Sequence, residues 1–466
     1  MRKPMLVATM VIAAGFGSVA CGRAPDRSAT IGVSDGAPAA TTPLDPKKRA
    51  EQGQKLYIAW CSGCHGERGR ADGPAAAFLV PKPRNFLTDR FKVRSTPSGK
   101  PPRRDDLLGT LVRGLPGTPM PSFGFLTEDE RGLIVDHVRK LAGLDQKPEV
   151  AALTAGAEPA STPESVDRGK ALYAKLGCAA CHGATGKGDG DSSKTLKDDK
   201  GQPLPARDYT KGLFMGGDTA TAIRMRFVTG MDGSPMPSFA DAMPNETDGW
   251  DLANYILSLR TPKEPYPTDK VALGRRVVDE RHCNGCHVIE GKGAQVGPSL
   301  DVVSAKLRFD YAKVWLTDPP AQGKVYPYMP YRMPNLGLTA EEIDGVLAYF
   351  ASIAHRDYPE SPPAAPKFDK ETIAKGQLLY FLKCTECHNM GTIVPTPAAK
   401  QQGPDLLNIS TRLRFDFMHV WVDNPKAMYP DSKMVDTNLT PAEIDQVTAF
   451  VWSTSVEGSK SAKPSP

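Results

Sequence analysis

A short motif, Cys-x-x-Cys-His, occurs four times in this chain of 466 residues and accounts for eight of its nine cysteines. Its members are Cys61, Cys64 and His65; Cys178, Cys181 and His182; Cys283, Cys286 and His287; and Cys384, Cys387 and His388. Chance would produce one such motif with a probability on the order of a few thousandths, so the pattern points to a shared chemical role.

The spacing within the motif suits one cofactor. Two thiols three positions apart can bond to the two vinyl groups of one haem, and the following imidazole then lies beside the iron as its proximal ligand. A zinc ribbon, a redox-active dithiol or disulfide bonds also use paired cysteines, but none of these alternatives requires the histidine. The sequence therefore predicts four covalently bound haem c groups.

The four histidines are spaced 117, 105 and 101 residues apart, which indicates a repeat of about 100 residues. The hydrophobic content of 40% allows packed cores, and the single long apolar run is N-terminal, which excludes a polytopic membrane protein. We expect an all-α chain of four tandem helical domains joined by linkers rich in proline and alanine. The expected domains cover residues 45–145, 165–261, 270–356 and 367–455.

The N-terminus carries an export signal. Arg2 and Lys3 precede an apolar stretch too short to span a bilayer, and small residues follow at 18–20. The segment 1–20 resembles a bacterial lipoprotein signal, although Ser18 stands where that family usually has leucine. The resemblance implies lipidation of Cys21 and a tether to the periplasmic side of a bacterial membrane. The composition that follows, rich in alanine, proline and threonine, indicates a linker at 21–44. Ordinary cleavage beside an unmodified Cys21 is the alternative.

The repeats resemble the class I, mitochondrial-type cytochrome c domain. That family has a glycine four residues before an aromatic residue in its opening helix, a pattern matched by Gly53 and Tyr57, Gly169 and Tyr173, and Gly376 and Tyr380. The third repeat has Gly274 followed by Val278. The resemblance implies that each glycine lets a closing helix cross closely. We expect closing helices at 126–143, 338–355 and 439–455, each beginning with a Leu-Thr cap, with His137 as an aromatic substitute at one crossing.

The resemblance also implies a distal methionine ligand on the loop before each closing helix. Met120 and Met236 lie in nearly identical Thr/Ser-Pro-Met-Pro-Ser-Phe loops, and Met333 and Met434 each lie 46 residues after their histidine. Met329 is a rival to Met333. Pro298 and Pro404 match the family residue whose carbonyl accepts a hydrogen bond from the proximal imidazole, and the first two repeats offer no clear counterpart.

Charge limits the partners. The net charge of +5 is small and interspersed, which argues against a nucleic acid partner. Positive charge gathers in the first repeat, notably in the loop 82–104. This loop is either a surface that meets acidic lipid or an acidic redox protein, or an ordinary solvated loop that balances the haem propionates. With methionine on every iron we expect no enzyme but an exported, membrane-tethered tetrahaem carrier of single electrons. A cytochrome subunit of a respiratory complex, or a multihaem enzyme with one open iron of the peroxidase or thiosulfate-oxidising type, are the alternatives.

Overall fold

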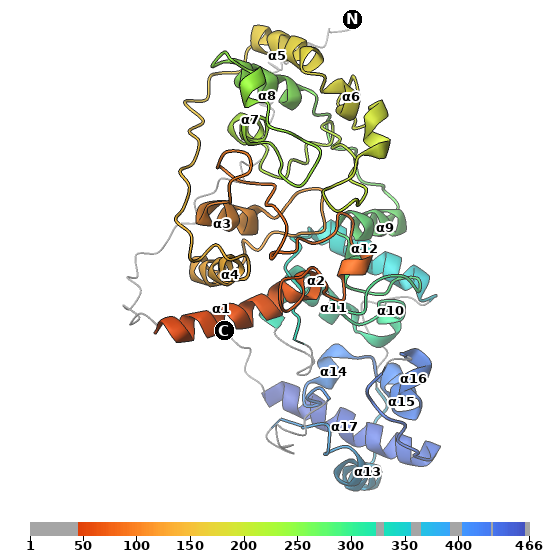
Figure 1. Cartoon of the computed structure of the whole chain (residues 1–466). Helices are drawn as coiled ribbons and strands as arrows, with labels where there is room; N and C mark the ends of the chain where they lie inside the picture. Colours follow the sequence, from red (N-terminus) through yellow and green to blue (C-terminus); the bar gives the residue numbers. More distant parts are fainter. Residues whose placement is uncertain (1–44, 323–329, 356–364, 392–402, 430–431, 462–466) are drawn as a thin grey trace, which may run out of the picture. The chain divides into compact units, whose positions relative to one another are not determined.

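The computed structural model describes residues 45–322, 330–355, 365–391, 403–429 and 432–461 (Figure 1). The predicted signal segment, Cys21, the predicted linker up to residue 44 and Met329 lie outside these described residues. The described chain is helical and contains no β-strand, only isolated bridges, so the fold is all-α as expected. None of its helices is long and apolar enough to cross a membrane.

The helices fall into four groups, each with one Cys-x-x-Cys-His motif, which we call units 1 to 4. Unit 1 contains α1 (Pro46–Trp60), α2 (Ser62–His65), η1 (Ala76–Phe78), α3 (Arg104–Arg113) and α4 (Glu128–Leu141). Unit 2 contains α5 (Pro163–Lys175), α6 (Ala179–His182), η2 (Asp191–Thr195), α7 (Ala220–Thr229), η3 (Ala240–Ala242) and α8 (Asp248–Ser258).

Units 3 and 4 share a second arrangement. Unit 3 contains α9 (Lys270–Glu280), η4 (Cys283–Gly285), α10 (Val303–Lys306), α11 (Phe309–Thr317), η5 (Pro320–Gln322) and α12 (Ala340–Ile353). Unit 4 contains α13 (Lys370–Lys383), α14 (Ile409–Arg412), α15 (Phe415–Asp423), α16 (Pro425–Met428) and α17 (Pro441–Ser461).

In every unit the opening helix crosses the closing helix at the predicted glycine. A Cβ atom built on Gly169 would lie 2.0 Å from the carbonyl oxygen of Asp251, and one on Gly376 would lie 1.9 Å from that of Gln446. Gly53 and Gly274 meet the backbone of α4 and α12 in the same way. No other residue permits this approach, so the glycines set the distance between the two helices that frame each unit.

Gly376→Ala is therefore expected to lower the free energy of unfolding of unit 4 by about 1–3 kcal/mol, because its methyl group must push α17 away. The helical propensity of alanine works in the opposite direction and does not offset a contact of this length. Gln377→Ala, on the exposed side of α13, is the matched control and should change stability by less than about 0.5 kcal/mol. Chemical denaturation of the holoprotein measures the free energy of unfolding of both variants. If Gly376→Ala and Gln377→Ala changed it equally, the close helix crossing at Gly376 would be contradicted.

The closing helices of units 1, 3 and 4 begin at the predicted threonines, whereas Thr247 before α8 of unit 2 makes no side-chain cap. The Thr127 hydroxyl accepts from the Glu130 amide at 3.2 Å, while the Glu130 carboxylate accepts from the Thr127 amide at 2.9 Å. The same reciprocal bonds join Thr339 to Glu342 and Thr440 to Glu443. These capping boxes satisfy amide groups that a helix start leaves without intrahelical partners.

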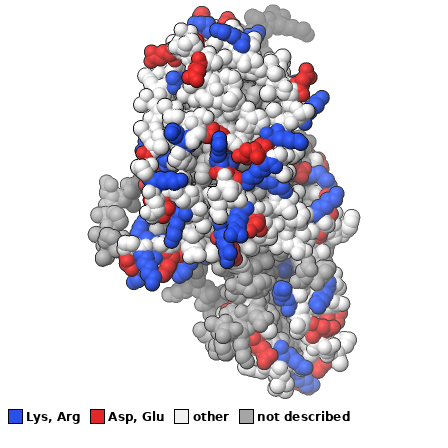
Figure 2. All heavy atoms as spheres, viewed as in Figure 1, with Lys and Arg blue, Asp and Glu red and all other residues white. Residues whose placement is uncertain are grey.

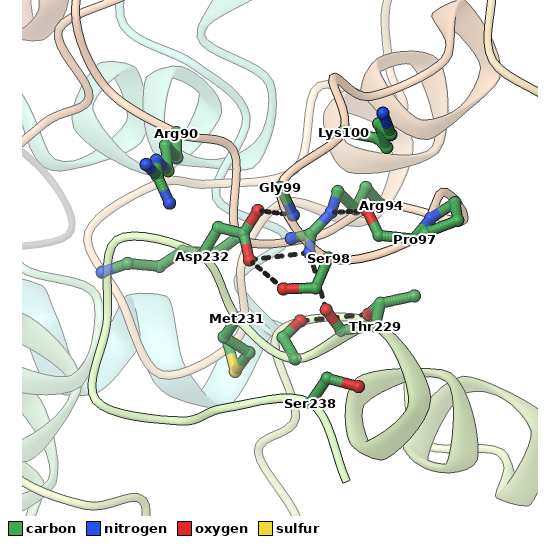
Figure 3. Close-up of polar contacts among 12 residues, drawn as sticks. Arg90, Arg94, Pro97, Ser98, Gly99, Lys100, Thr229, Met231, Asp232 and Ser238 are labelled. Atoms are coloured by element: carbon green, nitrogen blue, oxygen red, sulfur yellow. Dashed lines mark hydrogen bonds and ion pairs between the residues drawn. The ribbon is translucent and has the colours of Figure 1, made fainter. Parts of the chain in front are cut away.

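The basic loop of unit 1, residues 82–104, is only partly exposed. The Arg94 side chain is fully buried and donates to the Asp232 carboxylate of unit 2 at 2.8 Å and to the Thr229 carbonyl at 2.6 Å (Figure 3). Ser98 and the Gly99 amide also donate to Asp232. On the face drawn in Figure 2, positive and negative side chains are interspersed. Part of the predicted docking charge is therefore used to join units 1 and 2.

Candidate functional site

Each Cys-x-x-Cys-His motif forms one helical turn. The histidine amide donates to the carbonyl of the first cysteine at 2.9 Å in units 1, 2 and 4 and at 3.0 Å in unit 3. Residues i, i+3 and i+4 of a helix lie on one face, so this turn points two thiols and an imidazole to the same side. The eight cysteines of the described residues form no disulfide.

Tyrosines of the opening helices hold this turn in place. The Tyr57 hydroxyl donates to the Gly66 carbonyl at 2.7 Å, and the Tyr173 hydroxyl donates to the Gly183 carbonyl at 2.6 Å. In unit 4 the Tyr380 hydroxyl donates to the carbonyl of His388 at 3.1 Å. The aromatic residue that the family pattern places after the glycine thus fixes the end of the motif as well as the helix crossing.

The proximal imidazole of every unit donates its Nδ1 proton to a backbone carbonyl. In units 3 and 4 the acceptors are Pro298 at 2.7 Å from His287 and Pro404 at 2.9 Å from His388, the two prolines identified from the sequence. In units 1 and 2 the acceptors are Arg84 at 2.9 Å and Arg207 at 3.0 Å. A carbonyl can only accept, so Nδ1 carries the proton and the lone pair of the neutral ring lies at Nε2.

Units 1 and 2 also differ from units 3 and 4 in the residue that packs against the imidazole ring. The rings of Phe86 and Tyr209 stack on His65 and His182 at centroid distances of 4.6 and 4.3 Å. In units 3 and 4 a glycine occupies this space: a Cβ atom on Gly297 would lie 2.4 Å from the His287 ring, and one on Gly403 would lie 2.2 Å from the His388 ring. The repeated Arg-Asn-Phe, Arg-Asp-Tyr and Gly-Pro segments were visible in the sequence, but only the fold brings them to the histidines.

Burial keeps the histidines neutral. It lowers the pKa of His65 to about 4, and it lowers the pKa values of His182, His287 and His388. Burial also raises the pKa of the Cys61 thiol to about 12 and that of the Cys178 thiol to about 11. Neutral imidazoles beside protonated thiols in apolar surroundings match a site in which sulfur bonds to carbon and nitrogen binds a metal.

The methionine loops of units 1 and 2 have the same geometry. The Leu115 amide donates to the Met120 carbonyl at 3.1 Å, and the Met231 amide donates to the Met236 carbonyl at 3.0 Å. The Ser122 and Ser238 hydroxyls each donate at 2.6 Å to a carbonyl of the helix before the loop. The near-identical sequences therefore encode one loop shape, which holds the methionine at the same position in both units.

In unit 3 the Met333 sulfur accepts a hydrogen bond from the Trp315 indole at 3.4 Å. Trp315 and Trp421 end matching segments of units 3 and 4, residues 308–315 and 414–421, and neither segment by itself indicates this contact. In unit 4 the Met434 amide donates to the Ser432 hydroxyl at 3.1 Å. Arg308 and Arg414, which precede the tryptophans, are paired with Asp310 and Asp416 two residues later.

Unit 2 brings its predicted site residues around one cavity of about 1540 Å³. The lining includes Cys178, Cys181, His182 and Met236, together with Met120 of unit 1. The Tyr209 hydroxyl donates to His182 Nε2 at 2.9 Å. Since this nitrogen has one lone pair, a metal at Nε2 and the Tyr209 hydrogen bond exclude each other. The cavity also extends over residues of unit 3, such as Arg281 and Asn335, so its volume is not that of unit 2 alone. The paired thiols and the neutral imidazole on its wall fit a haem, whose iron would replace the Tyr209 hydrogen bond at Nε2.

Four histidines lie outside the motifs, and one of them, His355, is exposed at the end of unit 3. His137 packs against Tyr57 at a centroid distance of 4.9 Å, in the helix crossing where an aromatic residue was expected. His419 lies 2.9 Å from the Asp445 carboxylate. His282 precedes Cys283 in a left-handed backbone conformation and borders the cavity of unit 2.

Comparisons with known proteins agree with this architecture. The family model described as cytochrome c matches residues 50–142, 166–260, 271–354 and 373–455. The chain is 30% identical over 98 residues to cytochrome c oxidase subunit 2 of Alkalihalophilus pseudofirmus, covering 19% of this chain and 27% of that protein. It is 29% identical over 157 residues to the cbb3-type cytochrome c oxidase subunit CcoP of Rubrivivax gelatinosus, covering 34% of this chain and 42% of that protein. The matches thus span less than half of either relative.

A solved structure of the reducing HAO-like protein complex Kustc0457/Kustc0458 of Kuenenia stuttgartiensis is also similar. It has a TM-score of 0.44 and 36% sequence identity, and the match covers 45% of this chain and 96% of that chain. The family model extends over most of the present sequence and includes every motif. The chain therefore belongs to the cytochrome c family, with four cytochrome c domains and four covalently bound c-type haems.

Proposed function

We propose that this protein is an exported, membrane-tethered tetrahaem cytochrome that passes single electrons between redox partners and catalyses no reaction of its own. The observation that carries this proposal is that every unit pairs a neutral, carbonyl-bonded imidazole with a methionine in the loop before its closing helix. Two protein ligands on each iron leave no position for a substrate.

The residues have separate roles in this proposal. The cysteine pairs attach the haems, His65, His182, His287 and His388 are the proximal ligands, and Met120, Met236, Met333 and Met434 are the distal ligands. Each bound haem supplies an iron that cycles between the ferric and ferrous states. The backbone carbonyls at Nδ1 hold the rings in one orientation and raise their basicity, while the thioethers, as soft neutral ligands, favour the reduced state.

Export and tethering rest on residues 1–21. A charged start, a short apolar stretch and small residues before Cys21 support removal of a signal segment and lipidation of that cysteine. One acyl chain binds membranes weakly and several bind firmly, so a fully acylated Cys21 would keep units 1 to 4 at a periplasmic membrane surface. The similarity to cytochrome oxidase subunits supports a respiratory complex as a second candidate, in which the partner is permanent.

Carbon monoxide binding to the dithionite-reduced holoprotein tests the carrier function. We expect no stoichiometric shift of the Soret band, because each ferrous iron already has two axial ligands. Met236→Ala is the positive control, since loss of the thioether opens one position and should produce binding of about one equivalent per protein. Stoichiometric binding by the wild-type protein would instead identify an open iron and support an enzyme.

A further inference from the structure

Units 1 and 3, although separated in the sequence by unit 2, meet at their haem-attachment motifs. Ala75 and Leu79 of unit 1 form one buried apolar cluster with Ala294 and Val296 of unit 3. Cys64 and Cys286, the second cysteines of the two motifs, both pack against this cluster.

Further contacts surround this pair of cysteines. The Arg332 amide of unit 3 donates to the Ala59 carbonyl of unit 1 at 2.8 Å. The Arg332 guanidinium lies 5.7 Å from the centroid of the Trp60 ring, close enough for a cation–π interaction. The contact therefore combines apolar packing at the motifs with a polar edge.

Glycines in the motifs allow this approach. Gly63 and Gly285 each precede the second cysteine, and neither has a positive φ, so the backbone does not require glycine there. A Cβ atom on Gly285 would lie 2.4 Å from Leu79 Cδ2, and one on Gly63 would lie 3.3 Å from Val296 Cγ1. The same position is occupied by Ala180 in unit 2 and by Glu386 in unit 4, where both residues are exposed. Glycine at this position thus serves the contact between units 1 and 3 and not the attachment of haem.

We propose that units 1 and 3 face each other through their haem-attachment edges, so that electrons pass directly between the first and third haems without using the second. A haem attached at each motif would be joined to its second cysteine through a single carbon, so the packing of Cys64 and Cys286 against one cluster would bring the two haem edges close together. In each transfer one ferrous iron becomes ferric and the other ferric iron becomes ferrous, with no bond made and no proton moved. This inference rests on the proposed electron-transfer function.

The test compares Gly285→Glu with Ala180→Glu in the full-length holoprotein. Glu386 of unit 4 shows that the motif accepts glutamate, so both variants should keep four haems by intact mass. Gly285→Glu places a carboxylate against the apolar cluster, which should separate the two units. Two porphyrins in close contact give a bisignate Soret circular dichroism signal. We expect Gly285→Glu to lose the part of this signal that comes from haems 1 and 3, and Ala180→Glu to keep the wild-type spectrum.

Gly63→Glu changes the opposite side of the contact and should remove the same part of the Soret circular dichroism signal. Agreement between the two variants would show that the effect does not come from misfolding of a single unit. In a redox titration the wild-type pair should also interact, because oxidation of one haem raises the potential of its neighbour, and both glycine variants should lose that interaction. An unchanged spectrum and unchanged titration in both variants would overturn the direct path. The carbon monoxide experiment decides the carrier function separately, so either idea can fail alone.

Discussion

The double variant Cys178→Ser/Cys181→Ser is expected to carry three covalent haems instead of four. Serine hydroxyls do not form stable bonds with the vinyl groups, and the cavity of unit 2 offers no other thiol among its described lining residues. Intact mass after denaturation measures the loss as one haem mass. The loss should be complete, because no thiol remains at this motif to form the covalent bond.

Cys21→Ser is the matched control for this change. It should retain all four haems and lose the acyl groups that the wild-type spectrum is expected to show at Cys21. Four haems in the double variant would refute thioether attachment at this motif. A wild-type mass without acyl groups would reject lipidation and leave the haem assignment untouched.

Met236→Ala is expected to remove about a quarter of the sulfur-to-iron charge-transfer absorption of the oxidised protein, because one of four thioether ligands is lost. The potential of that haem should fall by a substantial part of the roughly 0.8 V range that axial ligands control. The methionine lies in a loop held by the bond from the Met231 amide to the Met236 carbonyl and by the bond from the Ser238 hydroxyl to the Val228 carbonyl, so we expect no other sulfur to replace it. Visible spectroscopy and a redox titration measure the two effects.

Met215→Ala provides the control, since Met215 borders the same cavity but lies outside the Met-Pro-Ser-Phe loop. It should leave both the band and the potential unchanged. In unit 3, Met333→Ala should give the same loss as Met236→Ala, and Met329→Ala should not. The reverse result there would move the distal ligand to Met329 and leave the other three assignments in place.

Much of each unit could be predicted from the sequence because it depends on local chemistry. A Cys-x-x-Cys-His turn places its thiols and imidazole on one helix face wherever it occurs, and Thr127 caps a helix because Glu130 follows three residues later. Gly376 could be recognised because a helix crossing of this closeness excludes every larger residue. His137 was identified as a packing residue by its position in the closing helix, and its ring lies against Tyr57.

Other features depend on contacts that no local pattern encodes. Arg84 and Arg207 orient the proximal histidines through their backbone carbonyls. Every residue has a backbone carbonyl, so the residue type does not reveal which one accepts the hydrogen bond. Arg94 belonged to a loop interpreted as a docking surface, yet it is buried against Asp232, a partner 138 positions away.

By itself the sequence determined that this protein has four covalent c-type haems in four helical cytochrome c domains, because attachment needs only five consecutive residues and each crossing needs only one glycine. The tertiary structure alone decided which units meet. Gly63 and Gly285 were unremarkable positions within their motifs until the fold packed Cys64 and Cys286 against one cluster. The physical reason is that packing between distant segments is selected by the combined shape and charge of two surfaces, and neither surface is continuous in the sequence.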